Sequence, residues 1–153
     1  MEVDFRNCLA EYSGHGVRFS YPDIWEITEE SDDGDILITV ASPGTCFWTL
    51  RLLPGCPAPP QVVESCVAAF QEEYDEMEVE KVTIHLAEMP AYARQLEFFC
   101  MELMNTVGLA SVRCNEMTIL IWWQGTDHEL IECQEILGHM TGSVRVDSLR
   151  DEK

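Results

Sequence analysis

The carboxyl-terminal part of the chain carries the side chains whose spacing comes nearest to a metal site. One helical face would present four of them at intervals of three or four residues: His128, Glu132, Glu135 and His139. Imidazole nitrogens and carboxylate oxygens are ligands for divalent transition metals. However, the order H-E-x-x-E lacks the second histidine of the zinc-protease motif, and a solvated amphipathic helix shows the same spacing. A metal-binding protein or an enzyme centred on this helix is therefore one alternative.

The densest acidic run is "EEYDEMEVE", residues 72–80. Its first half supplies four carboxylates: Glu72, Glu73, Asp75 and Glu76. A solvated helix end explains such a run most simply, and a loose calcium site would lack the EF-hand spacing. The functional interpretation is a docking site for a basic protein partner.

Other catalytic and cofactor-binding motifs are missing from the sequence. It contains no G-x-S-x-G, no P-loop and no G-x-G-x-x-G, and "SGHG" at 13–16 is typical of a turn. The seven cysteines are odd in number and form no C-x-x-C pair, so neither a disulfide framework nor a zinc ribbon is indicated. Four of them fall on apolar faces of predicted elements: Cys46, Cys66, Cys100 and Cys133. We expect a protein without a cofactor.

Charge narrows the classes of partner. The formal net charge is −19, from 28 acidic against 9 basic residues, which excludes a nucleic-acid-binding surface and disfavours anionic membranes. No apolar run approaches the ~20 residues of a membrane span. The amino terminus has acidic residues where a signal peptide needs bases. We expect a cytoplasmic monomer or weak dimer, whose acidic field serves solubility or attracts a basic partner.

Hydrophobic periodicity predicts two strand groups and two helices. Alternating stretches indicate strands over 17–21, 24–30, 35–42, 46–53, 80–86, 92–101, 106–114 and 117–123. The first helix begins at Pro60 and carries an apolar stripe at Val63, Cys66, Val67, Phe70 and Tyr74. The second begins with a capping box between Thr126 and Glu129, and Gly142 is its expected C-cap.

Adjacent aromatic residues predict a sheet that is apolar on both faces. Neighbours in a strand point to opposite sides, as in Phe47–Trp48, Phe98–Phe99 and Trp122–Trp123. One helix on each face gives a single-domain α+β protein over 1–153, an α/β/α sandwich with a largely antiparallel sheet of six or seven strands. A helix ~10 Å wide covers only about two strands ~4.8 Å apart, so loops cover the rest or it stays open to a partner. Trp48 and the outward-facing member of Trp122 and Trp123 are the candidate anchors.

Three segments resemble the PsbP-like family over about residues 12–147. They are "GVRFSYPDIWEI", similar to the family's opening hairpin with its aromatic-Pro corner, "EMPAYARQLEF", similar to its turn into a strand, and "MTILIWW" followed by a helix and "GSVRV". The resemblance implies the family's single-domain fold and a small bacterial binding protein rather than an enzyme. No segment matches the family's Ran-binding surface or the amino-terminal extension of its photosystem members.

The leading hypothesis is a non-enzymatic, acidic protein-binding module: an adaptor, a secretion chaperone or an immunity-type protein. It rests on the charge, the doubly apolar strands and the missing catalytic motifs. A structural subunit of a larger assembly is the third alternative, beside the metal protein or enzyme described above.

Overall fold

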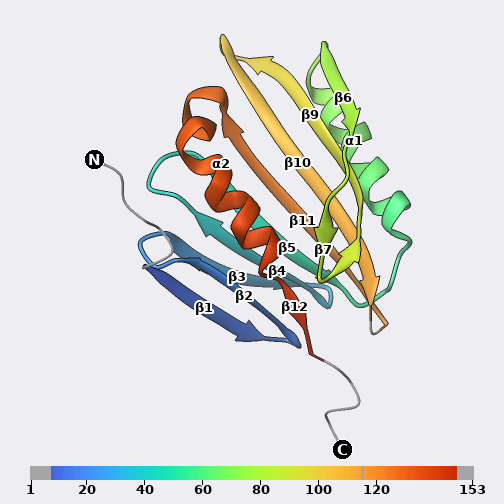
Figure 1. The fold of residues 1–153 in the computed structure, drawn as a ribbon. Helices are drawn as coiled ribbons and strands as arrows, with labels where there is room; N and C mark the ends of the chain where they lie inside the picture. Colours follow the sequence, from blue (N-terminus) through green and yellow to red (C-terminus); the bar gives the residue numbers. More distant parts are fainter. Residues whose placement is uncertain (1–7, 115, 148–153) are drawn as a thin grey trace, which may run out of the picture.

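The protein is a single α+β domain built on a seven-stranded antiparallel sheet (Figure 1). The computed structural model describes residues 8–114 and 116–147. In spatial order the strands are β3 (Glu26–Asp32), β4 (Asp35–Ala41), β5 (Phe47–Leu53), β11 (Met117–Thr126), β10 (Leu103–Cys114), β9 (Tyr92–Cys100) and β6 (Met77–Lys81). The predicted fold class, sheet size and two main helices are confirmed. Consecutive hairpins form β3–β4–β5 and β9–β10–β11, the pairing of β11 with β5 joins these two halves, and β6 is added at the edge beside β9.

Two smaller sheets flank the large one. The first joins β1 (Leu9–Gly14), β2 (Val17–Pro22) and β12 (Arg145–Val146), and the second is the short hairpin of β7 (His85–Leu86) and β8 (Met89–Pro90). The sequence predicts one strand over 80–86, but the chain leaves the sheet after Lys81 and only the β7 residues pair again, with β8.

The corner "FSYPDIWEI" transfers the chain between sheets. The turn signal "DGD" at 33–35 predicts that strand 35–42 returns as the hairpin partner of strand 24–30, and β3 does pair with β4. The resemblance likens this corner to an opening hairpin, but β2 pairs with β1 and β12 and not with β3. Pro22 ends β2, and the Trp25 amide donates to its carbonyl at 3.0 Å. Phe19 and Trp25 are both buried, so they fasten this corner to the core.

Helix α1 (Pro59–Glu73) covers one face of the large sheet. Two prolines occupy its first turn, where the missing N–H groups cost nothing, and its apolar stripe packs on β9, β10 and β11. The buried side chains of this layer are Val63, Val67, Leu96, Phe98, Val107, Leu109 and Leu120. Tyr74 is the C-cap residue, so the helix ends where the acidic run continues into β6.

Helix α2 (Asp127–Gly142) lies on the opposite face, beside the small three-stranded sheet (Figure 1). It contacts β2 and β11, and Leu137 and Met140 are buried in the larger of the two cores. The α/β/α arrangement is therefore confirmed. Gly142 is still part of the helix and Ser143 is the C-cap, whose amide donates to His139 and Met140. Among the described residues no helix is long and apolar enough to cross a membrane.

The predicted capping box of α2 is present and extends to a second element. Glu129 accepts hydrogen bonds from the Thr126 amide at 3.3 Å and from the Thr45 amide at 2.6 Å. Burial raises the pKa of the Glu129 carboxyl, but these hydrogen bonds, with one from the Cys46 amide, outweigh it and hold the pKa below its usual value. The carboxylate thus joins the start of α2 to the loop before β5.

Substituting Glu129→Gln should lower the free energy of unfolding by about 1 kcal/mol at pH 7, because the charged acceptor of these bonds is lost. The folded pKa lies below the unfolded one, so the contribution is full above pH ~4.5 and disappears as pH falls through the folded pKa. Urea denaturation at pH 7 and pH 3 measures this. The difference between wild type and variant should shrink at pH 3, and the exposed-site control Glu132→Gln should show little difference at either pH.

Candidate partner-binding surface

Trp48 is part of the core and not an accessible anchor. Its side chain is fully buried, its ring lies 4.8 Å from that of Phe19, and its Nε1 donates to Thr141 Oγ1 at 3.0 Å. The sequence placed Trp48 among the partner contacts because alternation gives two faces but does not say which is covered. Here α2 and the small sheet cover it.

Trp122 and Trp123 point to opposite faces of β11, as their adjacency predicts. Trp122 lies on the α1 side, edge-on to Phe47 and Phe70 at centroid distances of 5.4 and 5.8 Å. Its Nε1 is buried and has no hydrogen-bond partner among the described residues. Trp122 therefore belongs to the layer beneath α1.

Trp123 lies on the α2 side and is only half-buried. It pairs with Gly108 of β10, and a Cβ built on this glycine would lie 2.2 Å from the indole ring. The ring therefore lies flat over the strand, in a position that no other residue at 108 would allow. One side of the indole rests on the sheet and the other forms the floor of a hollow.

This hollow lies between α2, the β7 segment and the sheet, and its volume is about 420 Å³. Its lining residues are Ile84, His85, Gln95, Trp123, Gln134, Leu137, Gly138, Thr141 and Gly142. A smaller cavity of about 80 Å³ shares Ile84, Gln95 and Trp123 with it. On the helical wall, Cβ atoms added at Gly138 or Gly142 would have nothing within 4 Å, so this wall is open.

The hollow continues towards the edge strand β6. Gln95 also lines a third depression of about 430 Å³, together with Glu78, Val79, Glu80 and Glu97. One row of cross-strand neighbours connects the two ends: Trp123, Gly108, Gln95 and Glu80. We call this continuous surface, from the α2 wall across Trp123 and Gln95 to the three glutamates, the trough.

Exposed apolar side chains stand around the trough. Ile131 is 82 % exposed and precedes Gln134 by one turn on the same side of α2. Phe99 is 66 % exposed and follows Glu97 by two residues, so it shares that face of β9. At the hairpin tip, Met101 and Glu102 have φ of 53° and 66°, a left-handed pair that turns of this type usually fill with Asn-Gly. Strand pairing therefore holds a strained tip that presents apolar groups.

The predicted acidic residues Glu72, Glu73, Asp75 and Glu76 are all exposed, at the end of α1 and in the turn into β6. They do not line the trough, but the same run continues into Glu78 and Glu80, which do. Glu97 and Gln95 lie far away in sequence and join them through the pairing of β6 with β9.

The four side chains of the metal alternative do not form a site. His128, Glu132 and Glu135 are exposed along α2, and His139 is half-buried. Within residues 8–114 and 116–147, no group of three or more His, Cys, Asp or Glu side chains is arranged to hold a metal ion. The same residues contain only free cysteines.

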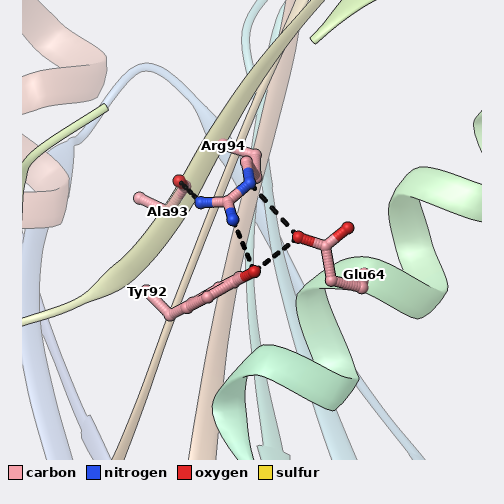
Figure 2. A network of polar contacts seen from close by, with 4 residues as sticks. All are labelled: Glu64, Tyr92, Ala93 and Arg94. Atoms are coloured by element: carbon pink, nitrogen blue, oxygen red, sulfur yellow. Dashed lines mark hydrogen bonds and ion pairs between the residues drawn. The ribbon is translucent and has the colours of Figure 1, made fainter. Parts of the chain in front are cut away.

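A polar network lies on the α1 side (Figure 2). Arg94 donates to the Tyr92 hydroxyl and to the Ala93 carbonyl, and forms an ion pair with Glu64 at 3.2 Å. Tyr92 in turn donates to Glu64, and this hydrogen bond raises the pKa of its phenol. The phenol therefore stays protonated at neutral pH, and the network ties α1 to β9.

A second network fastens the small sheet to the edge strand β3. Glu29 accepts a hydrogen bond from the Tyr12 hydroxyl at 2.7 Å and contacts His15 Nε2 at 2.6 Å. Burial and this hydrogen bond raise the pKa of Tyr12, while the bonds from Tyr12 and His15 lower the pKa of Glu29. The members satisfy one another, so this network is also structural.

Comparison with known proteins identifies the fold class. No protein-family model matches the chain, and no curated protein matches it either. Solved structures do match: the chain has the PsbP-like fold, as the sequence resemblance implies.

Three structures show the extent of this likeness. Cyanobacterial PsbP (CyanoP) from Synechocystis sp. PCC 6803 matches with a TM-score of 0.59 and 11% identity, over 91% of this chain and 92% of its own. LpqN, involved in cell envelope biogenesis of Mycobacterium tuberculosis, matches with a TM-score of 0.52 and 12% identity, over 94% and 95%. A protein from Bacteroides thetaiotaomicron matches with a TM-score of 0.55 and 11% identity, over 88% of this chain and 46% of the Bacteroides chain. This chain therefore spans about half the length of the Bacteroides protein.

Alanine substitutions at two glycines should have different effects on stability, because Gly108 lies beneath Trp123 and Gly138 lies on the open side of α2. Gly108→Ala forces the Trp123 ring away from β10 and should cost about 1–3 kcal/mol of stability. Gly138→Ala meets nothing and should be neutral or stabilise α2 by up to about 1 kcal/mol. Urea denaturation gives the stabilities, and the indole N–H resonance of Trp123 reports the ring position. An unmoved Trp123 resonance in Gly108→Ala would contradict the placement of the ring.

Proposed function

We propose that this chain is a non-enzymatic protein-binding module and that the trough receives side chains of a protein partner. One observation carries the proposal: Trp123 is only half-buried on the α2 side of the sheet and lines an open hollow of about 420 Å³ beside that helix.

The composition of the trough supports binding rather than catalysis. It combines an aromatic floor and aliphatic residues with a few polar groups, which is the usual make-up of a recognition surface. The polar networks at Arg94 and Glu29 do not line the trough, and the groups in each network are hydrogen-bonded to one another. Adaptor, secretion-chaperone and immunity-type roles all require this kind of surface.

The open helical wall supports the same proposal. Glycine within a helix costs roughly 1 kcal/mol relative to alanine, and neither Gly138 nor Gly142 is required by a neighbouring atom of the described chain. Space beside a helix that the chain itself does not fill is what a partner's side chain needs. Trp123 then provides the large ring that dominates many protein interfaces.

Filling the hollow should abolish binding without unfolding the protein. In Gly138→Leu the new side chain enters space that is open in the structure, while Glu132→Leu adds the same group to another, exposed position of α2. Affinity capture from lysate with wild type and both variants, at low and high salt, identifies proteins that depend on the trough. We expect proteins retained by wild type and by Glu132→Leu that Gly138→Leu loses.

Thermal unfolding of each variant is the accompanying control. If Gly138→Leu is as stable as wild type and captures the same proteins to the same extent, the trough is not the binding surface.

A further inference from the structure

We infer that the occupant of the trough is an extended segment of another protein that carries one bulky apolar side chain and basic side chains next to it. This inference rests on the proposed function and specifies the chemistry of the partner. The apolar side chain would contact Trp123, and the basic groups would meet Glu78, Glu80 and Glu97.

The three glutamates form an arrangement that a cation would relieve. Glu78 of β6 is directly opposite Glu97 of β9, and Glu80 is opposite Gln95. Like charges in direct cross-strand register destabilise a sheet, so this pair costs the free protein stability. Because the repulsion falls when a positive group lies between the two carboxylates, the site favours a basic ligand.

The described chain does not supply that positive group. Its arginines are engaged elsewhere: Arg18 with Asp147, Arg51 with Asp35, Arg94 with Glu64, Arg145 with Glu88, and Arg113 with the Cys56 carbonyl. The lysine of β6, Lys81, lies opposite Arg94 and so belongs to the other face of the sheet from Glu78 and Glu80. Within residues 8–114 and 116–147, no ion pair reaches Glu78, Glu80 or Glu97. The acidic end of the trough is therefore available to an external cation.

The row of neighbours from Trp123 to Glu80 sets the spacing of the occupant. The indole lies over Gly108, so two strand intervals, about 10 Å, separate it from β6. An extended chain advances ~3.3 Å per residue. A basic residue two to four positions from the apolar side chain would therefore reach the glutamates while that side chain contacts Trp123.

Charge also decides between this occupant and two others. A second copy of this chain, with a net charge of −19, would bring its own acidic surface against the glutamates. A purely apolar segment would fill the hollow but leave the opposed carboxylates of Glu78 and Glu97 unrelieved. The basic-apolar segment satisfies both ends of the trough.

Synthetic peptides test the inference directly. The probe is a nine-residue peptide with a central leucine, lysines two and four positions to either side, and serines elsewhere. Two matched peptides replace either all lysines by glutamate or the leucine by serine. Titration calorimetry at low salt should detect binding of the first peptide only, and raising the salt to 0.5 M should weaken it at least several-fold.

Paired variants separate local from overall charge. The triple variant Glu78→Gln, Glu80→Gln, Glu97→Gln should bind the lysine peptide about tenfold more weakly. The control Glu26→Gln, Glu30→Gln, Asp32→Asn removes three charges from the opposite edge strand β3 and should bind within about twofold of wild type. Gly138→Leu should lose the peptide.

The outcomes distinguish the inference from the proposed function. If the two triple variants bind the lysine peptide equally, or if the glutamate peptide binds as well, the basic occupant is wrong. If Gly138→Leu still loses captured partners in that case, the trough remains the binding surface for an apolar occupant. If Gly138→Leu binds both partners and peptide like wild type, the proposed function fails as well.

Discussion

One geometric constraint governs this molecule: its central sheet is apolar on both faces, and the chain supplies two helices to cover seven strands. A helix ~10 Å wide covers about two strands spaced ~4.8 Å apart. On one face α1 lies over β9, β10 and β11. On the other face the sheet is covered by α2 together with the small sheet of β1, β2 and β12. Val17 and Phe19 of β2 pack with Trp48 and Ile38 in one core. The small sheet thus serves as a third covering element. The segment with β7 and β8 packs on the same core through Leu86, and the trough lies between this segment, α2 and the edge strand β6.

The two adjacent tryptophans of β11 show the effect of this unequal cover, on which the proposed binding surface depends. Trp122 is enclosed by Phe47 and Phe70 beneath α1 and contributes to packing. Trp123, one residue later, rests on Gly108 because that residue lacks a Cβ, and it is only half-buried at the edge of the larger core. A ring held flat in this way has lost its rotational freedom before any partner arrives, so binding would cost little additional side-chain entropy. Rigidity below and open space above are the two requirements of a binding anchor, and Gly108 and Gly138 provide them.

The sequence predicts those features that depend on local periodicity and fails where long-range pairing decides. Both helices, the Thr126–Glu129 capping box and the two-sided strands follow from spacing alone, and the structure has all of them. The three-stranded sheet was missed for two reasons. No strand was predicted over β1, and β12 has two residues, which become a strand only by pairing with Val17 and Arg18. For the candidate site, the sequence predicts that the outward-facing tryptophan is either Trp122 or Trp123. It does not predict that Glu97 lies beside the acidic run, because this depends on the register of β6 against β9, which no local pattern encodes.

The acidic residues of the edge strands serve two purposes that the structure separates. Charges on an exposed edge prevent pairing with the edge of another chain, and both edge strands, β3 and β6, are rich in glutamate or aspartate. That purpose is sufficient for Glu26, Glu30 and Asp32. It does not explain Glu97, because β9 is an interior strand whose backbone is paired on both sides. A carboxylate placed opposite Glu78 on an already protected edge adds repulsion without adding protection. The position of Glu97 therefore favours a role in recognition. Because an apolar hollow lies next to it, the expected partner segment carries both cationic and apolar side chains.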